Sequence, residues 1–143
     1  MVDIPTLDIE DYDPDLNEEE EAVEDQAGGA LTYAIVGAGQ GGGRMAKAFY
    51  DMGYTKTVAV NTARSDLNGL DIPDEQKFLV DEHGEQGAGK DQAKAQAAIE
   101  RKEQEVFNLF REVFGTNVDR ILICLGVSGG SGGGTVNTLI KVA

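Results

Sequence analysis

Two glycine-rich runs, each directly after a short apolar run, constrain the fold of this chain more than any other feature. The first covers residues 37–43 and follows an apolar run at 31–36; the second covers 126–135 and follows one at 121–125. Short apolar runs that are rich in β-branched residues and bounded by glycine are typical of buried strands. The sequence therefore predicts two buried strands, each followed by a glycine-rich loop that leads into a helix.

More strands and helices are expected between and after these runs. Two further strands are predicted at 57–60 and 78–80, with a loop or short helix at 64–76. Met45, Phe49 and Met52 have the spacing of one helical face, and Gly53 is placed to cap the C-terminus of that helix.

The longest helix is expected to begin after Asp91, a good N-cap, and to run without interruption to residue 114. Ile99, Val106, Phe110 and Val113 form its apolar face, and Gly115 ends it. A short closing helix is expected at 136–142.

Alternating strands and helices predict an α/β fold: a doubly wound, mainly parallel, Rossmann-like sheet joined by right-handed crossovers. In such sheets ligands bind beyond the carboxyl ends of the strands, where the strand order reverses. Both glycine-rich runs follow strands at that edge. This placement is the main physical reason to expect a nucleotide site.

The charge of the chain divides it into two parts. The formal net charge is −14, but residues 1–29 carry 12 of the 26 carboxylates and no Lys or Arg. We expect an acidic disordered tail at 1–29 and one nucleotide-binding α/β domain at 30–143. Alternatively, the tail docks on a protein partner, a neighbouring subunit, through its apolar residues Ile4, Leu7, Ile9, Tyr12 and Leu16. Neither part offers the basic surface that nucleic acid needs, so no direct nucleic-acid ligand is expected.

Cysteine content and hydropathy suggest the compartment. Cys124 is the single cysteine, so neither an internal disulfide nor a multi-cysteine metal site is expected. No apolar run approaches the roughly 18 residues of a membrane span. We expect a cytoplasmic protein without a membrane partner.

The first glycine run contains a GxGxxG match, and its backbone amides could approach a phosphate at a helix N-terminus. Candidate ligands are Gly39, Gln40, Gly41 and Gly42; the alternative is a sharp turn without a ligand. A dinucleotide site would place an acid at the end of the second strand, where this chain has Asn61. An NAD-dependent oxidoreductase is disfavoured but stays open.

A second glycine-bearing segment, from Gly84 to Lys90, matches a Walker A loop except for its last residue. That residue should be Ser or Thr to ligate magnesium, and here it is Asp91, which argues against a P-loop enzyme. A milder interpretation is that Gly87, Ala88 and Gly89 close over a terminal phosphate through their amides, with Lys90 as counter-charge. Lys90 is equally explained as a surface lysine.

In the second glycine run, all residues from 126 to 135 except Val127 are Gly, Ser or Thr. Successive backbone amides could wrap a di- or triphosphate, and the hydroxyls of Ser131 and Thr135 could add hydrogen bonds. A flexible linker is equally glycine-rich, but it would not normally interrupt a strand-to-helix connection in a compact domain.

Together these segments, over about residues 31–143, resemble the tubulin/FtsZ superfamily. Ala38-Gly39-Gln40 resembles the first phosphate loop of tubulin. Val60-Asn61-Thr62 with Asp66-Leu67 is similar to the loop after the second strand of FtsZ, and Gly87-Ala88-Gly89 to the γ-phosphate loop. Ser128 to Gly134 resembles the signature GGGTGSG, although Gly133 lacks the usual hydroxyl. The implied nucleotide-binding residues are Gly39, Gln40, Gly41, Gly42, Asn61, Gly87, Ala88, Gly89, Lys90, Ser128, Gly129, Gly130, Ser131, Gly132, Gly133, Gly134 and Thr135.

The resemblance implies GTP or GDP as ligand, with Mg²⁺ as a companion ion, and assembly into a homo-oligomer or filament. It also implies that the water-activating carboxylates lie outside residues 1–143, so no residue here is assigned a catalytic or metal-binding role. Two functions follow: the N-terminal portion of a filament-forming GTPase, active once completed by a catalytic loop, or a non-hydrolysing structural module that keeps the nucleotide-binding fold.

Overall fold

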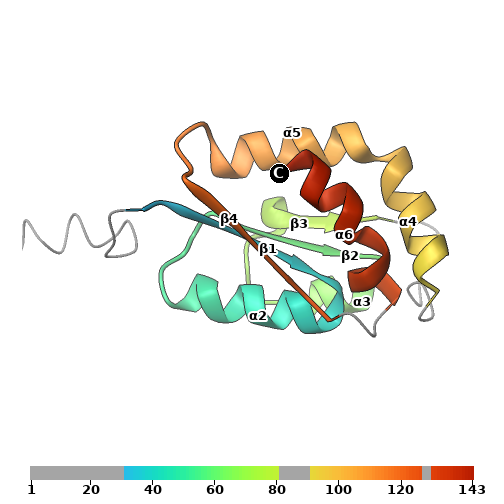
Figure 1. Cartoon of the computed structure of the whole chain (residues 1–143). Coiled ribbons are helices and arrows are strands. Elements are labelled where there is room, and N and C mark those ends of the chain that lie inside the picture. The colour runs from blue at the N-terminus through green and yellow to red at the C-terminus, as the bar shows by residue number, and fades with distance from the viewer. Residues whose placement is uncertain (1–30, 81–90, 127–129) are drawn as a thin grey trace, which may run out of the picture.

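A computed structural model describes residues 31–80, 91–126 and 130–143, which form a parallel four-stranded sheet with helices on both faces (Figure 1). The strand order is β3-β2-β1-β4, and every pairing is parallel. This confirms the predicted α/β class. The expected acidic tail at 1–29 lies outside the described residues. The strands are β1 (Tyr33–Ala38), β2 (Thr57–Asn61), β3 (Lys77–Leu79) and β4 (Arg120–Leu125).

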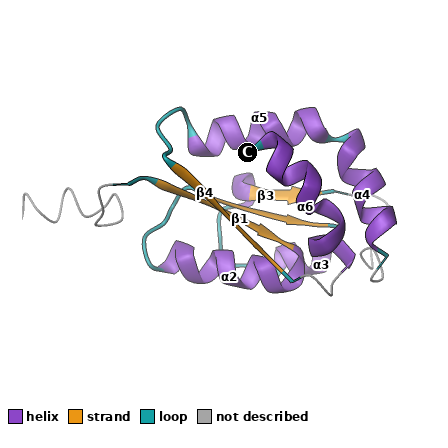
Figure 2. Cartoon of the chain, in the orientation of Figure 1, coloured by secondary structure: helices purple, strands orange, loops and turns teal. Residues whose placement is uncertain are grey.

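Two groups of helices cover the sheet (Figure 2). One face carries α2 (Gly39–Asp51) and the short α3 (Arg64–Asn68), and a 3-10 turn, η2 (Asp74–Gln76), leads into β3. The other face carries α4 (Gln92–Arg101), α5 (Glu103–Phe114) and α6 (Gly130–Val142). Among the described helices, none combines the length and apolar character needed to cross a membrane.

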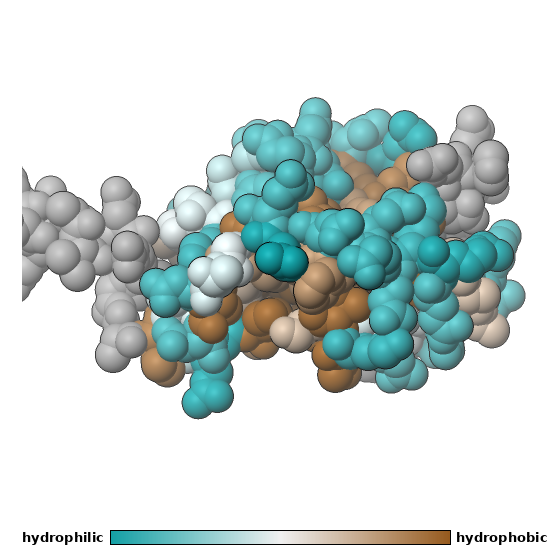
Figure 3. Space-filling model, turned by 90° about the horizontal axis from the view of Figure 1, so that it is seen from above, coloured by the Kyte–Doolittle hydropathy of each residue, from teal (hydrophilic) through white to brown (hydrophobic). Residues whose placement is uncertain are grey.

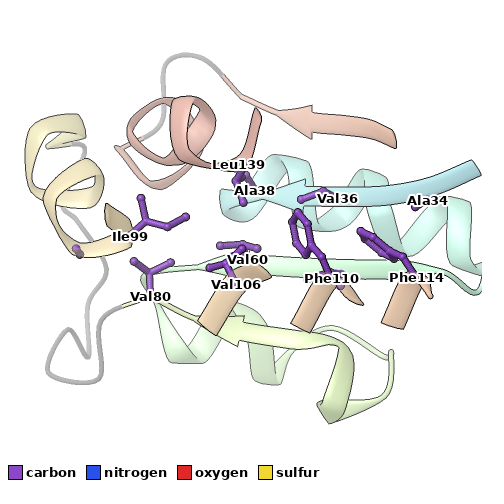
Figure 4. Packing of buried hydrophobic residues seen from close by; sticks show 12 residues of the cluster. Ala34, Val36, Ala38, Val60, Val80, Ile99, Val106, Phe110, Phe114 and Leu139 are labelled. Carbon is purple, nitrogen blue, oxygen red and sulfur yellow. The ribbon is translucent and has the colours of Figure 1, made fainter. Parts of the chain in front are cut away.

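The main hydrophobic core lies between the sheet and the α4–α5–α6 layer (Figure 4). Alternate residues of β1 point into it, as strand geometry requires. Phe110 and Phe114 of α5 lie against β1 with ring centroids 5.0 Å apart, and Leu139 of α6 lies beside Ala38. Its fully buried members are Ala34, Val36, Ala38, Val58, Val60, Val80, Ile99, Val106 and Leu139.

The opposite face is packed by small residues, which corrects the predicted face of α2. Met45 and Met52 are 50% and 63% exposed, so of the predicted stripe only Phe49 contacts the core. The buried face of α2 consists of Gly39, Gly42, Gly43 and Ala46. Small side chains let the helix axis lie close to the strands, and apolar periodicity does not register glycine.

Three predicted helix boundaries are confirmed. Gly53 has φ +101°, and the N–H groups of Gly53 and Tyr54 donate to the carbonyls of Tyr50 and Phe49, which is a Schellman motif. The Asp91 carboxylate accepts the Lys94 N–H at 3.2 Å and caps α4. Gly115, with φ +69°, ends α5.

The predicted uninterrupted helix to residue 114 is wrong, because the chain bends at Lys102, where φ is −112° and ψ is 15°. The bend lets α4 pack against the start of α6 while α5 turns to run along the sheet (Figure 1). Ile99 and Val106 on either side keep helical spacing and share one core, so the apolar pattern carries no sign of the break.

Candidate functional site

The candidate site lies at the edge of the sheet where β1, β2 and β4 end. β1 pairs in parallel with both β2 and β4. The chain adds β2 and β3 on one side of β1 and then crosses back to place β4 on the other side, so the strand order reverses at β1. The helices that follow β1 and β4 both begin at this edge (Figure 1). Such a switch point is where open α/β sheets bind ligands.

The first predicted phosphate loop is largely helix. Residues 37 and 38 complete β1, and α2 begins at Gly39, which has φ +75°. Ala38 provides no side-chain cap, and the first turn contains no acidic residue. The first N–H groups of an α-helix have no intrahelical partner. In α2 these are the N–H groups of Gly39, Gln40 and Gly41. The start of α2 is therefore a concentration of N–H donors and positive dipole.

The second predicted phosphate loop is also largely helical, because α6 begins at Gly130 and not at 136. Its first turn contains no acidic residue either, so it offers a second set of helix-terminal amides. Thr135 is 1% exposed and its hydroxyl donates to the Gly132 carbonyl at 3.5 Å. The Ser131 side chain is not among those described.

Glycines bring the helix starts and strand ends into backbone contact. A Cβ at Gly42 would lie 2.2 Å from the carbonyl oxygen of Cys124 in β4. One at Gly132 would lie 2.9 Å from the carbonyl oxygen of Gly126 and 3.1 Å from that of Ala38. Real Cβ atoms do not approach backbone as closely as 2.2 Å, so Gly42 allows α2 to sit against β4. Gly41 has no such neighbour within 4 Å and faces open space.

Gln92, at the start of α4, lies against α6 at this edge, a contact that the sequence did not reveal. A Cβ at Gly133 would lie 2.6 Å from the Gln92 side-chain nitrogen, and one at Gly134 would lie 2.3 Å from the Gln92 carbonyl oxygen. The Gln92 amide therefore occupies the space that a hydroxyl-bearing side chain at Gly133 would need. The one available signal was its position directly after the N-cap Asp91.

Asn61 is 3% exposed at the end of β2, and both ends of its side chain are engaged. Its Oδ1 accepts the Ala63 N–H at 3.0 Å, and its Nδ2 donates to the Asp66 carboxylate at 3.2 Å. These bonds fix the chain between β2 and α3. A hollow of about 200 Å³ beside them is lined by Gly39, Gln40, Arg44, Asn61, Ser65, Asp66, Gly69 and Leu70.

The structure brings Gly39–Gly42, Asn61, Gly130 and Gly132–Thr135 to one edge of the sheet. Gly87, Ala88, Gly89, Lys90, Ser128 and Gly129 lie outside the described residues. Within the described ranges, no group of three His, Cys, Asp or Glu side chains is placed to hold a metal ion.

Cys124 lies close to the start of α2 but is not suited to nucleophilic chemistry. The residue is 5% exposed, and burial raises the pKa of its thiol above the ordinary value of 9.0. The thiol stays protonated at neutral pH, whereas a reactive cysteine needs a lowered pKa. Helix starts that present amides and carry no acidic residue in their first turn are chemically suited to hold an anion.

Comparison with known proteins identifies the family to which the chain belongs. The family model described as "Tubulin/FtsZ family, GTPase domain" matches residues 32–143. Tubulin-like protein CetZ1 of Haloferax volcanii is 30% identical over 121 residues, which are 78% of this chain and 31% of CetZ1. The chain therefore spans about a third of the length of this relative.

Solved structures agree. GDP-bound monomeric CetZ1 of Haloferax volcanii superposes with a TM-score of 0.69 at 33% identity, over 76% of this chain and 36% of that one. A GTPγS-bound protofilament of CetZ2 from the same organism gives 0.68 at 30% identity, over 76% and 34%. The family match covers most of the chain and the parallel sheet has the same fold, so the chain belongs to the tubulin/FtsZ family.

Proposed function

We propose that this chain is the nucleotide-binding part of a cytoplasmic, filament-forming cytoskeletal protein, and that it binds GTP and GDP with the phosphates at the starts of α2 and α6. The observation that carries the proposal is the pair of acid-free helix N-termini at the strand-order switch, held in backbone contact with the strand ends by Gly42 and Gly132. Helix starts of this kind attract phosphate through free amides and the helix dipole. The relatives with GDP and GTPγS bound support the same ligand class.

The residues divide into two roles in this proposal. The amides of Gly39, Gln40 and Gly41 bind one end of the phosphate chain, and those at the start of α6 bind the other. Gly42, Gly132 and Gly134 allow the close packing that places these amides. Gly87–Lys90 and Ser128–Gly129 stay predicted phosphate contacts.

Asn61 argues against NAD as the ligand. A dinucleotide site uses a free carboxylate at the end of the second strand to accept from the ribose hydroxyls. Here that position is an amide whose oxygen and nitrogen are bonded to the Ala63 N–H and to Asp66. Asn61 is therefore proposed to position the chain beside the nucleotide.

Mg²⁺ fits this proposal as a partner of the phosphates more than of the protein. The ion keeps several waters and binds phosphate oxygens with few protein ligands, which is consistent with the lack of an acidic cluster among the described residues. Hydrolysis needs a group that activates water, and no described residue is assigned that role. We propose GTPase activity only when carboxylates from outside residues 1–143 complete the site.

One observation favours the second candidate, a non-hydrolysing module that assembles with other proteins. Among the described strands β4 pairs with β1 alone, and Leu122 on it is 40% exposed. An unpaired edge with an exposed apolar side chain is suited to adding a strand from another segment or chain.

Binding of a fluorescent GTP analogue to the 143-residue chain, competed with GTP, ATP and NAD, tests the proposal. Competition by GTP alone supports it; equal competition by NAD, or no binding by a folded sample, contradicts it. Phosphate release by a longer chain that supplies the missing carboxylates separates the two candidates, because only the GTPase is expected to turn over.

A matched pair of charge substitutions sharpens this test. Gly41→Asp places a carboxylate at the start of α2, where it favours the helix dipole but repels phosphate. We expect at least about tenfold weaker GTP binding, equivalent to about 1.4 kcal/mol, without loss of folded stability. Ala48→Asp adds the same charge at an exposed position further along α2 and should leave binding unchanged. Equal binding by both variants would contradict the role of this helix start.

A further inference from the structure

A second concave surface lies at the opposite end of the sheet, away from the nucleotide edge. It is a cavity of about 390 Å³ between the second half of α5, the start of β4 and the end of α6, here named the amino-end groove. This volume falls within the roughly 300–1,000 Å³ typical of ligand sites. Apolar side chains dominate its lining: Phe107, Phe110, Phe114, Val118, Ile121 and Val142.

Two arginines give the amino-end groove a positive rim. Arg111 lies over the Phe107 ring, with its guanidinium carbon 5.8 Å from the ring centroid, and Arg120 lines the groove at the start of β4. No ion pair is found for either arginine within residues 31–80, 91–126 and 130–143. The one acidic side chain in the lining, Asp119, accepts the Thr32 N–H at 2.7 Å. The groove therefore suits an occupant that is both apolar and acidic.

The N-terminal segment of this chain is attached directly at the rim of the groove. The Thr32 carbonyl accepts the N–H groups of Asp119 and Arg120, at 2.9 and 3.2 Å. Together with the Thr32 N–H bond to Asp119, this pins the chain beside two residues of the groove lining. Figure 3 views the molecule from the α5 side and shows apolar residues exposed among hydrophilic ones on that face.

We propose that residues 7–16 of the same chain dock in the amino-end groove. Their sequence, LDIEDYDPDL, consists of four apolar residues, five carboxylates and Pro14. Leu7, Ile9 and Tyr12 supply side chains for the apolar floor, and the acids between them face Arg111 and Arg120. Both halves of this complementarity are needed, because exposed ion pairs alone contribute little.

The connection between residues 7–16 and the rim of the groove is long enough to reach it and short enough to keep the segment close to it. Fourteen residues, 17–30, join the segment to the rim. A random-coil chain of that length would have a root-mean-square span of about 20 Å. Short flexible links give effective concentrations on the order of millimolar, so even a segment whose free peptide binds with a millimolar Kd would be docked about half of the time.

Paramagnetic broadening on the whole chain tests the docking. A nitroxide is attached at Asn17→Cys; the buried Cys124, 5% exposed, is expected to stay unlabelled, which mass spectrometry verifies. We expect strong broadening of amide signals at Phe114, Val118 and Ile121, and little at Asn61 on the opposite edge. The broadening should be lost at high salt, because the Debye length falls from about 30 Å at 0.01 M to about 3 Å at 1 M.

Charge reversals with a matched control identify the rim. Arg111→Glu with Arg120→Glu should abolish broadening in the groove. Arg64→Glu with Lys94→Glu makes the same charge change at exposed positions near the nucleotide edge and should leave broadening intact. A second variant leaves the folded domain unaltered and removes charge from the tail only. It combines Asp8→Asn, Asp11→Asn, Asp13→Asn and Asp15→Asn, and it should also abolish broadening in the groove.

Three results would overturn the proposal. The first is equal broadening at the groove and at Asn61, and the second is groove broadening that survives both the arginine and the tail substitutions. The third is broadening that arises only between separate labelled and isotope-enriched molecules, which would make the occupant a second copy of the chain.

Discussion

The contact between Gly42 of α2 and the backbone of β4 predicts opposite effects for alanine at two adjacent glycines. In Gly42→Ala the new methyl carbon would lie 2.2 Å from the Cys124 carbonyl oxygen and 3.1 Å from the Leu125 Cα. Ordinary contact begins near 3.4 Å, so the helix start and β4 would have to separate by more than 1 Å. In Gly41→Ala the methyl meets no atom within 4 Å.

The expected magnitudes follow from packing and helix propensity. Overpacking costs about 1–3 kcal/mol, and the upper part of that range applies because the clashing atoms are backbone. Alanine in a helix regains at most about 1 kcal/mol relative to glycine. Gly42→Ala should therefore lower the free energy of unfolding by about 2 kcal/mol, and Gly41→Ala should raise it by up to about 1 kcal/mol.

Urea unfolding followed by circular dichroism measures this difference of about 3 kcal/mol between the two variants. With a urea m-value of about 1–3 kcal/mol per molar, their midpoints should differ by about 1 M or more. Equal midpoints, or a more stable Gly42→Ala variant, would refute the close packing of α2 on β4 and with it the placement of the α2 amides.

Three further outcomes are expected. Asn61→Ala removes two hydrogen bonds, to Asp66 and from the Ala63 N–H, and should cost about 2 kcal/mol by urea unfolding; unchanged stability would contradict the role of Asn61 in fixing the β2–α3 connection. Because burial raises the pKa of the Cys124 thiol above 9.0, the folded state holds its proton longer than the unfolded state does. The free energy of unfolding should be insensitive to this group below pH 9 and should fall between pH 9 and the raised pKa. Cys124→Ala should reduce this decline. If the variant shows the full decline, the thiol is not its cause, which would argue against burial of the thiol. Lys141→Ala breaks the 2.8 Å pair with Glu103, but Lys141 is 69% exposed, so the loss should stay below about 1 kcal/mol; a larger loss would show that this pair anchors α6 to α5.

Local signals predicted much of the fold. Gly53, Asp91 and Gly115 mark helix ends through conformations and hydrogen bonds made within a few residues, and all three are confirmed. The order of strands and helices predicted a parallel sheet because a crossover between parallel strands needs a helix between them. These features depend on neighbouring residues, which the sequence displays directly.

The remaining features depend on contacts between distant segments. Residues 39–43 and 130–135 were predicted as loops because glycine usually weakens helices, yet both are helix starts whose glycines meet backbone far away in the sequence. Met45 and Met52 were predicted to share one helical face with Phe49, but both are exposed, because the buried face of α2 is made of glycine and alanine. The role of Gln92 beside Gly133 likewise becomes visible only when α4 and α6 are brought together.

The most direct test of the central proposal is to follow backbone amide resonances of the 143-residue chain as GTP is added. The account predicts that the amides of Gly39, Gln40, Gly41 and Gly132 shift together, while those of Thr32 and Thr116 at the other end of the sheet do not. Unchanged helix-start amides in the presence of bound GTP, or shifts confined to the opposite end, would contradict it.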